Sequence, residues 1–369
     1  MFIMELFKQR QVNWQDGMKL NKSHFVHADN YHIGQLVFSR NMLLNENNFG
    51  MLPSYDKTKY ANQIDLSLEG DFLHITKFRI AALMLNGMAI NVDSDEMDAG
   101  SFDIQNLKLK FRYTEFNETS FVLIFKINAF KGLEYGNYDS EDFPLKRPFL
   151  IPFFEFILVP ESEAKKAYFS NDFFVVMKFQ VTSNQVVVDE KYIPPVTAVI
   201  ADKQLTEFHL FVYNSLNSIE NYLLDIAKKH VKNKTDNFSE TLVLMSAALI
   251  NHISAVKYEL KHKLIYAPPI DLIIKIKSFA NILHKTIEMR TSVGKDMFLN
   301  EVNRITGIPK HEFEELLKQI TNLEYRHHNI IESVELAINL VEKMVNIFRT
   351  FSEGDQKQKT KQFDIKIKR

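Results

Sequence analysis

Apolar and polar residues alternate with a period of two over much of the first half of the chain, from about residue 60 to residue 190. Leu107, Leu109 and Phe111, for example, alternate with Lys108 and Lys110. Such a pattern puts apolar side chains on one face of a strand and charged side chains on the other. Short strands without long helices between them are typical of an antiparallel sandwich or barrel. We therefore predict an all-β first domain.

Other segments of this half also have the character of strands. We expect them at about 72–80, 121–127, 149–159 and 173–181. The segment at 121–127 is apolar at successive positions rather than at alternate ones. That composition predicts a strand that is buried on both faces.

A double proline, Pro194-Pro195, ends the period-two pattern. Proline donates no hydrogen bond to a strand ladder and disfavours helix at the residue before it. Beyond it, apolar residues recur every three or four positions, as in amphipathic helices. We therefore place a β-sandwich domain at 1–193 and a helical domain at 194–352. The expected helices lie at about 205–226, 239–264, 268–290 and 295–306.

The most regular helical pattern lies at 313–351, where we expect one uninterrupted helix. Its period is close to 3.5 residues, which is typical of a coiled coil or a long bundle helix. The core of this seam consists of Leu323, His327, Ile330, Val334, Ala337, Val341, Met344 and Phe348. A single polar member such as His327 can fix the register and the oligomer number. The spacing fits a contact between copies of the chain and an intramolecular bundle equally well, so both alternatives stay open.

The last segment, 353–369, is basic and has no apolar face of useful size, so we expect a flexible tail. The predicted fold class is thus α+β and multidomain. An N-terminal antiparallel β-sandwich is followed by a C-terminal helical bundle.

Composition narrows the function classes. The chain has 45 basic and 46 acidic residues, so it offers no large basic face for nucleic acid. It contains no cysteine, which excludes disulfides, thiolate metal sites and a cysteine nucleophile. No apolar run is long enough to span a membrane, and the N-terminus lacks the features of a signal peptide. We expect a cytoplasmic protein.

The stretch 14–25 reads Trp-Gln-Asp-Gly-Met-Lys-Leu-Asn-Lys-Ser-His-Phe and holds the only tryptophan of the chain. Asp16-Gly17 is a turn dipeptide, because glycine accepts positive φ and aspartate bonds to its own backbone. The residues alone predict a strand, this turn and then a helix. The apolar positions expected to pack are Met18, Leu20 and Phe25.

Motifs for chemistry are missing from the sequence. There is no phosphate-binding glycine loop, dinucleotide fingerprint or hydrolase elbow. The best metal candidate is a local group made of His24, His27, Asp29 and His32. Its spacing does not match a metalloprotease helix motif, so a metal-dependent enzyme is the weaker alternative. We predict no catalytic residue, no metal and no cofactor, and we expect the acidic loop with Asp93, Asp95, Glu96 and Asp98 to be solvent-exposed.

The opening motif resembles a family signature. Trp14-x-Asp16-Gly17-Met18-x-Leu20 followed by His24-Phe25 is similar to the start of TssK, the baseplate adaptor of bacterial type VI secretion systems, which opens with Trp-x-Glu-Gly-Met-x-Leu-x-Pro-x-His-Phe. Two later stretches also resemble the family: Tyr192-Ile193-Pro194-Pro195 at the domain junction, and Ala267-Pro268-Pro269-Ile270-Asp271-Leu272 at the start of a neck helix. The resemblance covers roughly residues 10–350.

The resemblance implies a non-enzymatic homotrimer that joins the wedge proteins TssF and TssG to a membrane anchor made of TssL and TssM. It implies a shoulder similar to phage receptor-binding proteins, a helical neck, a head, and assembly at the inner face of the cytoplasmic membrane. It gives the seam defined above added weight as a trimer contact. The motif residues would pack the shoulder or face the wedge: Trp14, Asp16, Gly17, Met18, Leu20, His24 and Phe25.

Two residues depart from the signature. Lys22 stands where the family has proline, and Asp16 stands where it has glutamate. We also expect no folded head after the last helix, and hence a divergent, shortened form of the family. In such a form a different part of the chain, or another protein, would contact the membrane anchor. A phage-like tail adaptor of the same fold is the nearest alternative function.

Overall fold

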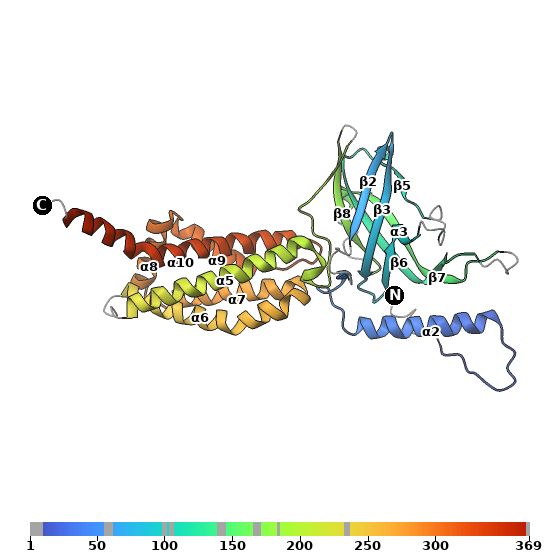
Figure 1. Ribbon diagram of the computed structural model, residues 1–369, viewed down its shortest axis with the longest axis horizontal. Helices are drawn as coiled ribbons and strands as arrows, with labels where there is room; N and C mark the ends of the chain where they lie inside the picture. Colours follow the sequence, from blue (N-terminus) through green and yellow to red (C-terminus); the bar gives the residue numbers. More distant parts are fainter. Residues whose placement is uncertain are drawn as a thin grey trace. The chain divides into compact units, whose positions relative to one another are not determined.

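The structure is a computed structural model that describes residues 10–54, 62–97, 102, 107–138, 145–164, 171–182, 185–231 and 237–366, with side chains as far as residue 353. The chain divides into two compact units. The first unit comprises Met1–Lys203 and His327–Ile330 and holds the strands. The second comprises Gln204–Arg326 and Ile331–Arg369 and is helical (Figure 1).

Two antiparallel sheets build the first unit. In the described residues, one sheet has five strands centred on β3 (Phe72–Leu83), and the other has four strands in the order β7-β6-β8-β9. The remaining strands are β1 (Gly50–Met51), β2 (Gln63–Glu69), β4 (Ala89–Asp93), β5 (Lys110–Arg112), β6 (Ser120–Tyr135), β7 (Phe149–Pro160), β8 (Phe173–Thr182) and β9 (Gln185–Val188). The helical pieces of this unit are α2 (Lys22–Asn41), α3 (Ser94–Met97), α4 (Glu161–Ala164) and 3₁₀ turns at Tyr113–Glu115 and Val199–Ala201.

The first half of strand β6 is buried on both faces, as its continuous apolar sequence predicts, whereas the residues beyond Ile127 are half-buried or exposed. One face carries Phe125, whose ring centroid lies 5.3 Å from that of Phe156 in β7. Phe156 in turn lies 5.4 Å from Phe78 of the other sheet, so the aromatic core joins the two sheets. The opposite face of β6 belongs to a separate cluster of Val122, Ile124, Ala164 and Val175. The predicted antiparallel sandwich is confirmed.

The double proline lies inside the first unit. Met51 N donates to Pro195 O at 2.8 Å, and Thr197 N donates to Met51 O at 2.9 Å. Gly50 has φ +113°, and a Cβ there would lie 2.0 Å from Pro195 O, so this close approach requires glycine. The unit continues to Lys203, which places the boundary later than the predicted 193/194. The prolines interrupt the strand pattern, but the residues that follow them still pair with β1.

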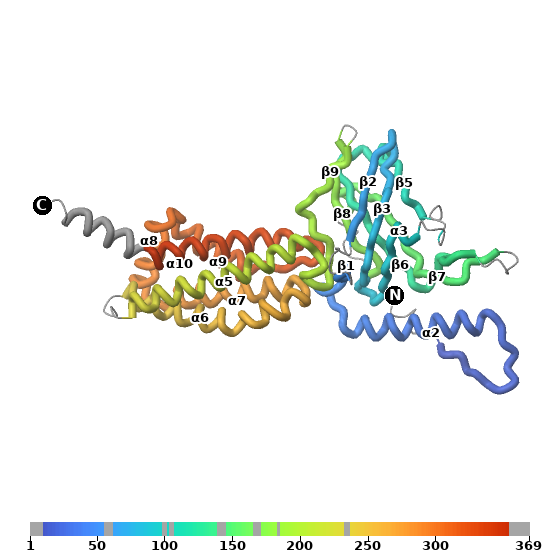
Figure 2. Tube along the Cα trace, in the orientation of Figure 1, coloured from blue at the N-terminus to red at the C-terminus, as the bar shows by residue number. Residues whose placement is uncertain are grey.

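The second unit consists of long helices that lie alongside one another (Figure 2). Its helices are α5 (Lys203–His230), α6 (Asn237–His262), α7 (Pro269–Glu288), α8 (Ser292–Thr306), α9 (Lys310–Asn322) and α10 (Ile330–Lys366). Helix α7 starts with Pro269, a position where the missing N–H costs nothing. Gly307 ends α8 in the left-handed conformation with φ +73°. The α+β fold class with a C-terminal helical bundle is confirmed.

One helix of this unit, α6, is long and apolar enough to cross a membrane. Length and composition are weak evidence, because the core helix of a soluble bundle has the same properties. In this structure α6 buries residues such as Leu242, Met245, Leu249 and Ile253 against its neighbours. We therefore interpret it as a bundle helix.

The region 313–351 is not one helix, contrary to the prediction. Helix α9 ends at Asn322 and α10 begins at Ile330. Leu323 has φ −54° and ψ 122°, a conformation that cannot continue an α-helix. His327 lies in this break and belongs to the first unit. The apolar spacing in the sequence looks continuous because α9 and α10 each bury one apolar face on either side of the break.

The seam expected to join copies of the chain is covered within one chain. Its members on α10 are at most 4% exposed: Ile330, Val334, Ala337, Val341, Met344 and Phe348. These side chains therefore serve an intramolecular core and offer no open face to a second copy. The backbone of residues 353–366 also continues α10, where the sequence predicts a flexible tail.

Candidate protein-interaction surface

The opening segment reverses direction at Asp16-Gly17, as predicted. Met18 N donates to Gln15 O at 3.2 Å, and Gly17 has φ +78°. A Cβ on Gly17 would meet nothing within 4 Å, so the positive φ, and not crowding, favours glycine. The described residues before this turn form no strand, which differs from the prediction.

The turn brings Trp14 onto the first turn of α2. Its ring centroid lies 6.2 Å from that of His24 and 6.1 Å from that of Phe25. The ring of Trp14 therefore contacts the rings of His24 and Phe25, although ten and eleven positions separate it from them in the sequence. Trp14 and Phe25 nevertheless remain 48% and 53% exposed. The motif packs against itself, but its apolar side chains are not buried in a core.

The start of α2 explains why Lys22 is compatible with the motif. The side chain of Asn21 accepts hydrogen bonds from Ser23 N at 3.0 Å and His24 N at 3.3 Å, so Asn21 is the N-cap. Lys22 is then the first helical residue. Proline is favoured at that position because the N–H there has no partner within the helix. The family proline and Lys22 thus suit the same helix start.

Helix α2 leaves much of its apolar surface exposed. Phe25 and Leu36 are eleven residues apart and so lie on the same side of the helix. We define the arm–α2 surface by the following exposed apolar residues: Trp14, Leu20, Phe25, Leu36, Met42 and Leu43. Met42 and Leu43 are 72% and 79% exposed. Exposed apolar side chains of this kind are typical of protein-interaction sites.

The opposite side of α2 rests on the sandwich. Gly34 and Val37 are its buried residues. A Cβ on Gly87 would lie 2.4 Å from Val37 O, so the helix backbone comes very close to the loop between β3 and β4. Arg40 Nη1 donates to Gly87 O at 3.5 Å. This narrow contact holds α2 in place while its other face stays open.

The metal alternative is not supported by geometry. Among the described residues, no group of three or more histidine and carboxylate side chains could hold a metal ion. His24, His27, Asp29 and His32 all lie on α2 but do not converge. His24 contacts the ring of Trp14, and its Nδ1 is buried without a hydrogen-bond partner in the structure. His32 contacts the ring of Tyr31 instead.

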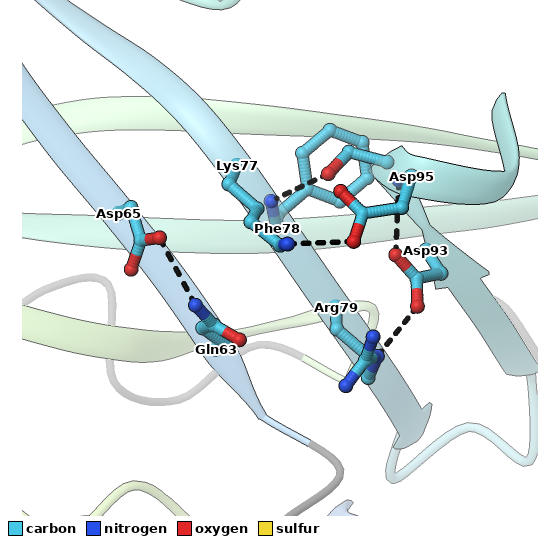
Figure 3. Close-up of polar contacts among 8 residues, drawn as sticks. Gln63, Asp65, Lys77, Phe78, Arg79, Asp93 and Asp95 are labelled. Atoms are coloured by element: carbon cyan, nitrogen blue, oxygen red, sulfur yellow. Dashed lines mark hydrogen bonds and ion pairs between the residues drawn. The ribbon is translucent and has the colours of Figure 1, made fainter. Parts of the chain in front are cut away.

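The acidic residues predicted in an exposed loop lie instead at the end of β4 and in α3, and Asp93 and Asp95 pair with two cations of β3 (Figure 3). Arg79 Nε donates to Asp93 Oδ2 at 2.5 Å, and Lys77 Nζ donates to Asp95 Oδ2 at 2.6 Å. Burial raises the pKa of Asp93, but the hydrogen bonds from Arg79 and from the backbone of Asp95 outweigh it, so the pKa lies below its usual range. These carboxylates fasten α3 to the sheet and are not placed for acid–base chemistry. Asp98 lies outside the described residues.

Comparison with known proteins gives matches to the three-dimensional fold and not to the sequence. No family model matches the sequence, and no curated protein matches it. Ten chains of solved structures match in three dimensions, and two of them show the extent of the match. A chain of the baseplate complex from the type VI secretion system superimposes with a TM-score of 0.54 at 14% identity, covering 90% of this chain and 99% of that one. The crystal structure of TssK superimposes with a TM-score of 0.50 at 15% identity, covering 91% of this chain and 69% of that one.

The chain has a TssK-like fold. The three stretches that resemble TssK take distinct places in it. The motif at 14–25 opens α2, the double proline pairs with β1, and Pro268-Pro269 starts α7. At 14–15% identity the match concerns the fold, and it agrees with the resemblance carried by the short motifs.

Sequence patterns did not reveal the full extent of exposed apolar surface in this TssK-like chain. Leu36, Met42 and Leu43 follow no helical period that marks them as exposed. A second exposed patch lies where β6 and β7 form a two-stranded ribbon (Figure 1). Phe149 and Leu150 are neighbours in β7, yet they are 64% and 69% exposed. In a strand that is covered on one face, one of two successive side chains is buried. This rule fails in the ribbon of β6 and β7, where other described parts of the chain cover neither face.

Proposed function

We propose that this protein is a structural, non-enzymatic subunit of a type VI secretion baseplate. The TssK-like fold, which spans 90% of the chain and 99% of the matched baseplate chain, is the observation that carries the proposal.

The arm–α2 surface is a second observation that supports the proposal. An adaptor needs a face that is apolar and accessible before assembly, and this surface has both properties. We propose that it binds the wedge proteins TssF and TssG, the partners that the resemblance implies. Trp14, His24 and Phe25 would form one end of the contact, and Met42 and Leu43 the other.

The proposal includes assembly and location. The protein is a homotrimer in the cytoplasm and joins the wedge to the membrane anchor at the inner face of the membrane. The buried seam of α10 does not provide the trimer contact, so the contact must involve other surfaces. Light scattering over a range of concentrations tests the trimer directly.

Co-purification with TssF and TssG from the same secretion cluster tests the wedge contact. Leu36→Gln, Met42→Gln and Leu43→Gln in one chain should abolish co-purification and leave the oligomeric mass unchanged. Exposed apolar-to-polar changes at such positions alter stability little. Trp14→Ala with Leu20→Gln tests the other end of the surface separately.

The matched control is a triple variant on the helical unit. Tyr258, Met289 and Val293 are 74%, 84% and 60% exposed and lie outside the arm–α2 surface. Their replacement by glutamine should leave co-purification intact. Wedge binding that survives every arm–α2 variant, or that fails equally in the control, would contradict the assignment of this surface.

A further inference from the structure

Strand β7 is the last strand of its sheet and has one free edge. The sheet has the order β7-β6-β8-β9, and in the part of the chain that the structure describes β6 is the only strand paired with β7. Outside this pairing, no backbone hydrogen bond joins residues 150–158 to another described residue. An edge strand of this kind presents a row of unpaired N–H and C=O groups.

The register of the sheet shows which residues of β7 face the free edge. Ile127 of β6 pairs with Phe154 of β7, but Ile127 N donates to the oxygen of Asp172, the residue that precedes β8, at 3.2 Å. Ile127 and Phe154 are therefore a non-hydrogen-bonded pair, whose backbone groups point away from each other. Phe154 thus directs its N–H and C=O to the free edge. Phe156 and Leu158 do the same, because the direction alternates from residue to residue along a strand.

Two prolines of β7 agree with this assignment. Pro152 and Pro160 lie an even number of positions from Phe154, so they also face the free edge. Proline has no N–H, and within sheets it is confined to positions where that group would face outward. Prolines also protect an edge against unwanted pairing. Here they leave the donors of Phe154, Phe156 and Leu158 free between them, so the edge offers a pairing site of limited length.

Apolar side chains continue along this edge. Phe149 and Leu150, at the start of β7, are 64% and 69% exposed. They lie in the ribbon of β6 and β7, which extends beyond the rest of the sandwich (Figure 2). Further along β7, Phe153 and Ile157 are half-buried. A strand added to this edge would therefore meet apolar side chains on both faces of the sheet, which favours a segment with apolar residues of its own.

The other end of the same sheet is a poorer site. Strand β9 has four residues, Gln185–Val188, and lies beside β2 of the other sheet. Val187 and Val188 are 51% and 40% exposed, but the strand is too short for a long main-chain contact. Strand β7, with twelve residues, is the edge that suits a partner strand.

We propose that β7 binds an extended segment of the TssF–TssG wedge by strand addition. Main-chain hydrogen bonds to Phe154, Phe156 and Leu158 supply the pairing, and apolar residues of the segment cover Phe149 and Leu150. Helix α2 contacts β6, so a protein bound to the arm–α2 surface is close to the ribbon. The inference rests on the proposed function and adds the mode by which the wedge is recognised.

Hydrogen exchange resolved to single amides tests the contact. In the free protein the amides of Phe154, Phe156 and Leu158 should exchange fast, because no hydrogen bond protects them. In the complex with TssF and TssG their exchange should slow by at least about tenfold. Glu155 and Ile157 are the internal controls. Their N–H groups point to β6, so they should be protected in both states.

Phe149→Glu with Leu150→Glu removes the apolar part of the contact at exposed positions. It should weaken wedge binding by at least about tenfold, because two apolar side chains are lost and two charges take their place. The matched control is Val187→Glu with Val188→Glu on β9, at the other edge of the same sheet. It should bind the wedge as the wild type does. Circular dichroism verifies the fold of both variants.

Edge amides that are already protected in the free protein would overturn the inference, as would undiminished binding by the β7 variant or equal losses in the β7 and β9 variants. A complex that forms while the edge amides stay unprotected overturns strand addition alone and leaves the baseplate role in place. A wild-type protein that binds neither TssF nor TssG overturns the proposed function, and this inference with it.

Discussion

His327 Nε2 donates a hydrogen bond to the backbone oxygen of Phe49 at 2.8 Å, although 278 positions separate the two residues in the chain. The rings of the two residues also contact each other, with centroids 5.0 Å apart. A carbonyl oxygen only accepts, so Nε2 must carry the proton. His327 is 4% exposed, and burial lowers its pKa to about 4. This bond fixes the short segment His327–Ile330 within the first unit.

The first prediction concerns pH. The pKa of His327 is about 4 in the folded state and 6.5 without the burial that folding imposes. Between pH 4 and pH 6.5 the unfolded chain therefore binds more protons than the folded chain. Its contribution to stability is therefore complete above pH 6.5 and is lost as the pH falls toward 4. The loss amounts to about 3 kcal/mol. Urea unfolding at several pH values between 7 and 4 measures it.

His327→Gln is the matched variant, since glutamine keeps a donor but does not titrate in this range. We expect it to be less stable than the wild type at pH 7, and to show a smaller loss of stability on acidification. Parallel stability curves for the two proteins between pH 7 and 4 would contradict the assignment to His327.

The second prediction separates two neighbouring ion pairs. Arg79 and Asp93 are 20% and 14% exposed, whereas Lys77 and Asp95 are 35% and 53% exposed. Arg79→Met leaves a mostly buried carboxylate without its cation and should cost about 3 kcal/mol of unfolding free energy. Lys77→Met breaks a pair that water screens and should cost at most about 1 kcal/mol. Equal losses in chemical denaturation would show that burial does not decide the difference.

The third prediction concerns the start of α2. Lys22→Pro should stabilise the protein by about 0.5 kcal/mol, because proline at the first helical position restricts the unfolded chain at little cost to the helix. Asn21 has φ −146° and ψ 167°, an extended conformation that a following proline permits. Asn21→Ala removes the cap and should destabilise by about 1 kcal/mol. Thermal unfolding measures both, and a lower melting temperature for Lys22→Pro would refute the N1 placement.

The fourth prediction compares two glycines. Gly50→Ala places a Cβ 2.0 Å from Pro195 O in a backbone with φ +113°, so we expect little folded, soluble protein. Gly70→Ala also requires a positive φ, +57°, but its Cβ would meet nothing within 4 Å. It should cost only about 1 kcal/mol and remain soluble. Comparable yields and melting temperatures would mean that β1 moves away from Pro195 easily.

Local pattern predicted a large part of this fold. The period of two in the first half and the period of three to four in the second half distinguish strand from helix, because each period reports which side chains turn toward a core. The turn at Asp16-Gly17 and the helix start at Pro268-Pro269 followed from backbone chemistry that acts within a few residues. The motif around Trp14 pointed to the TssK fold through its residue types and their spacing alone.

The same periodicity gave a wrong prediction where segments far apart in the sequence cause the burial. Apolar spacing at 313–351 suggested one helix, because the pattern records burial and is blind to the break at Leu323. It also could not tell whether α10 is covered by its own chain or by a second copy.

The sequence by itself determined the kinds of secondary structure, their order, the main turns and the absence of catalytic motifs. Only the tertiary structure decided that the double proline belongs to the first unit, that His327 binds Phe49, and that the face of α2 with Phe25 and Leu36 stays exposed. The reason is that periodicity and turn chemistry act over a few residues. Exposure and long-range hydrogen bonds depend on which distant segments come together when the chain folds.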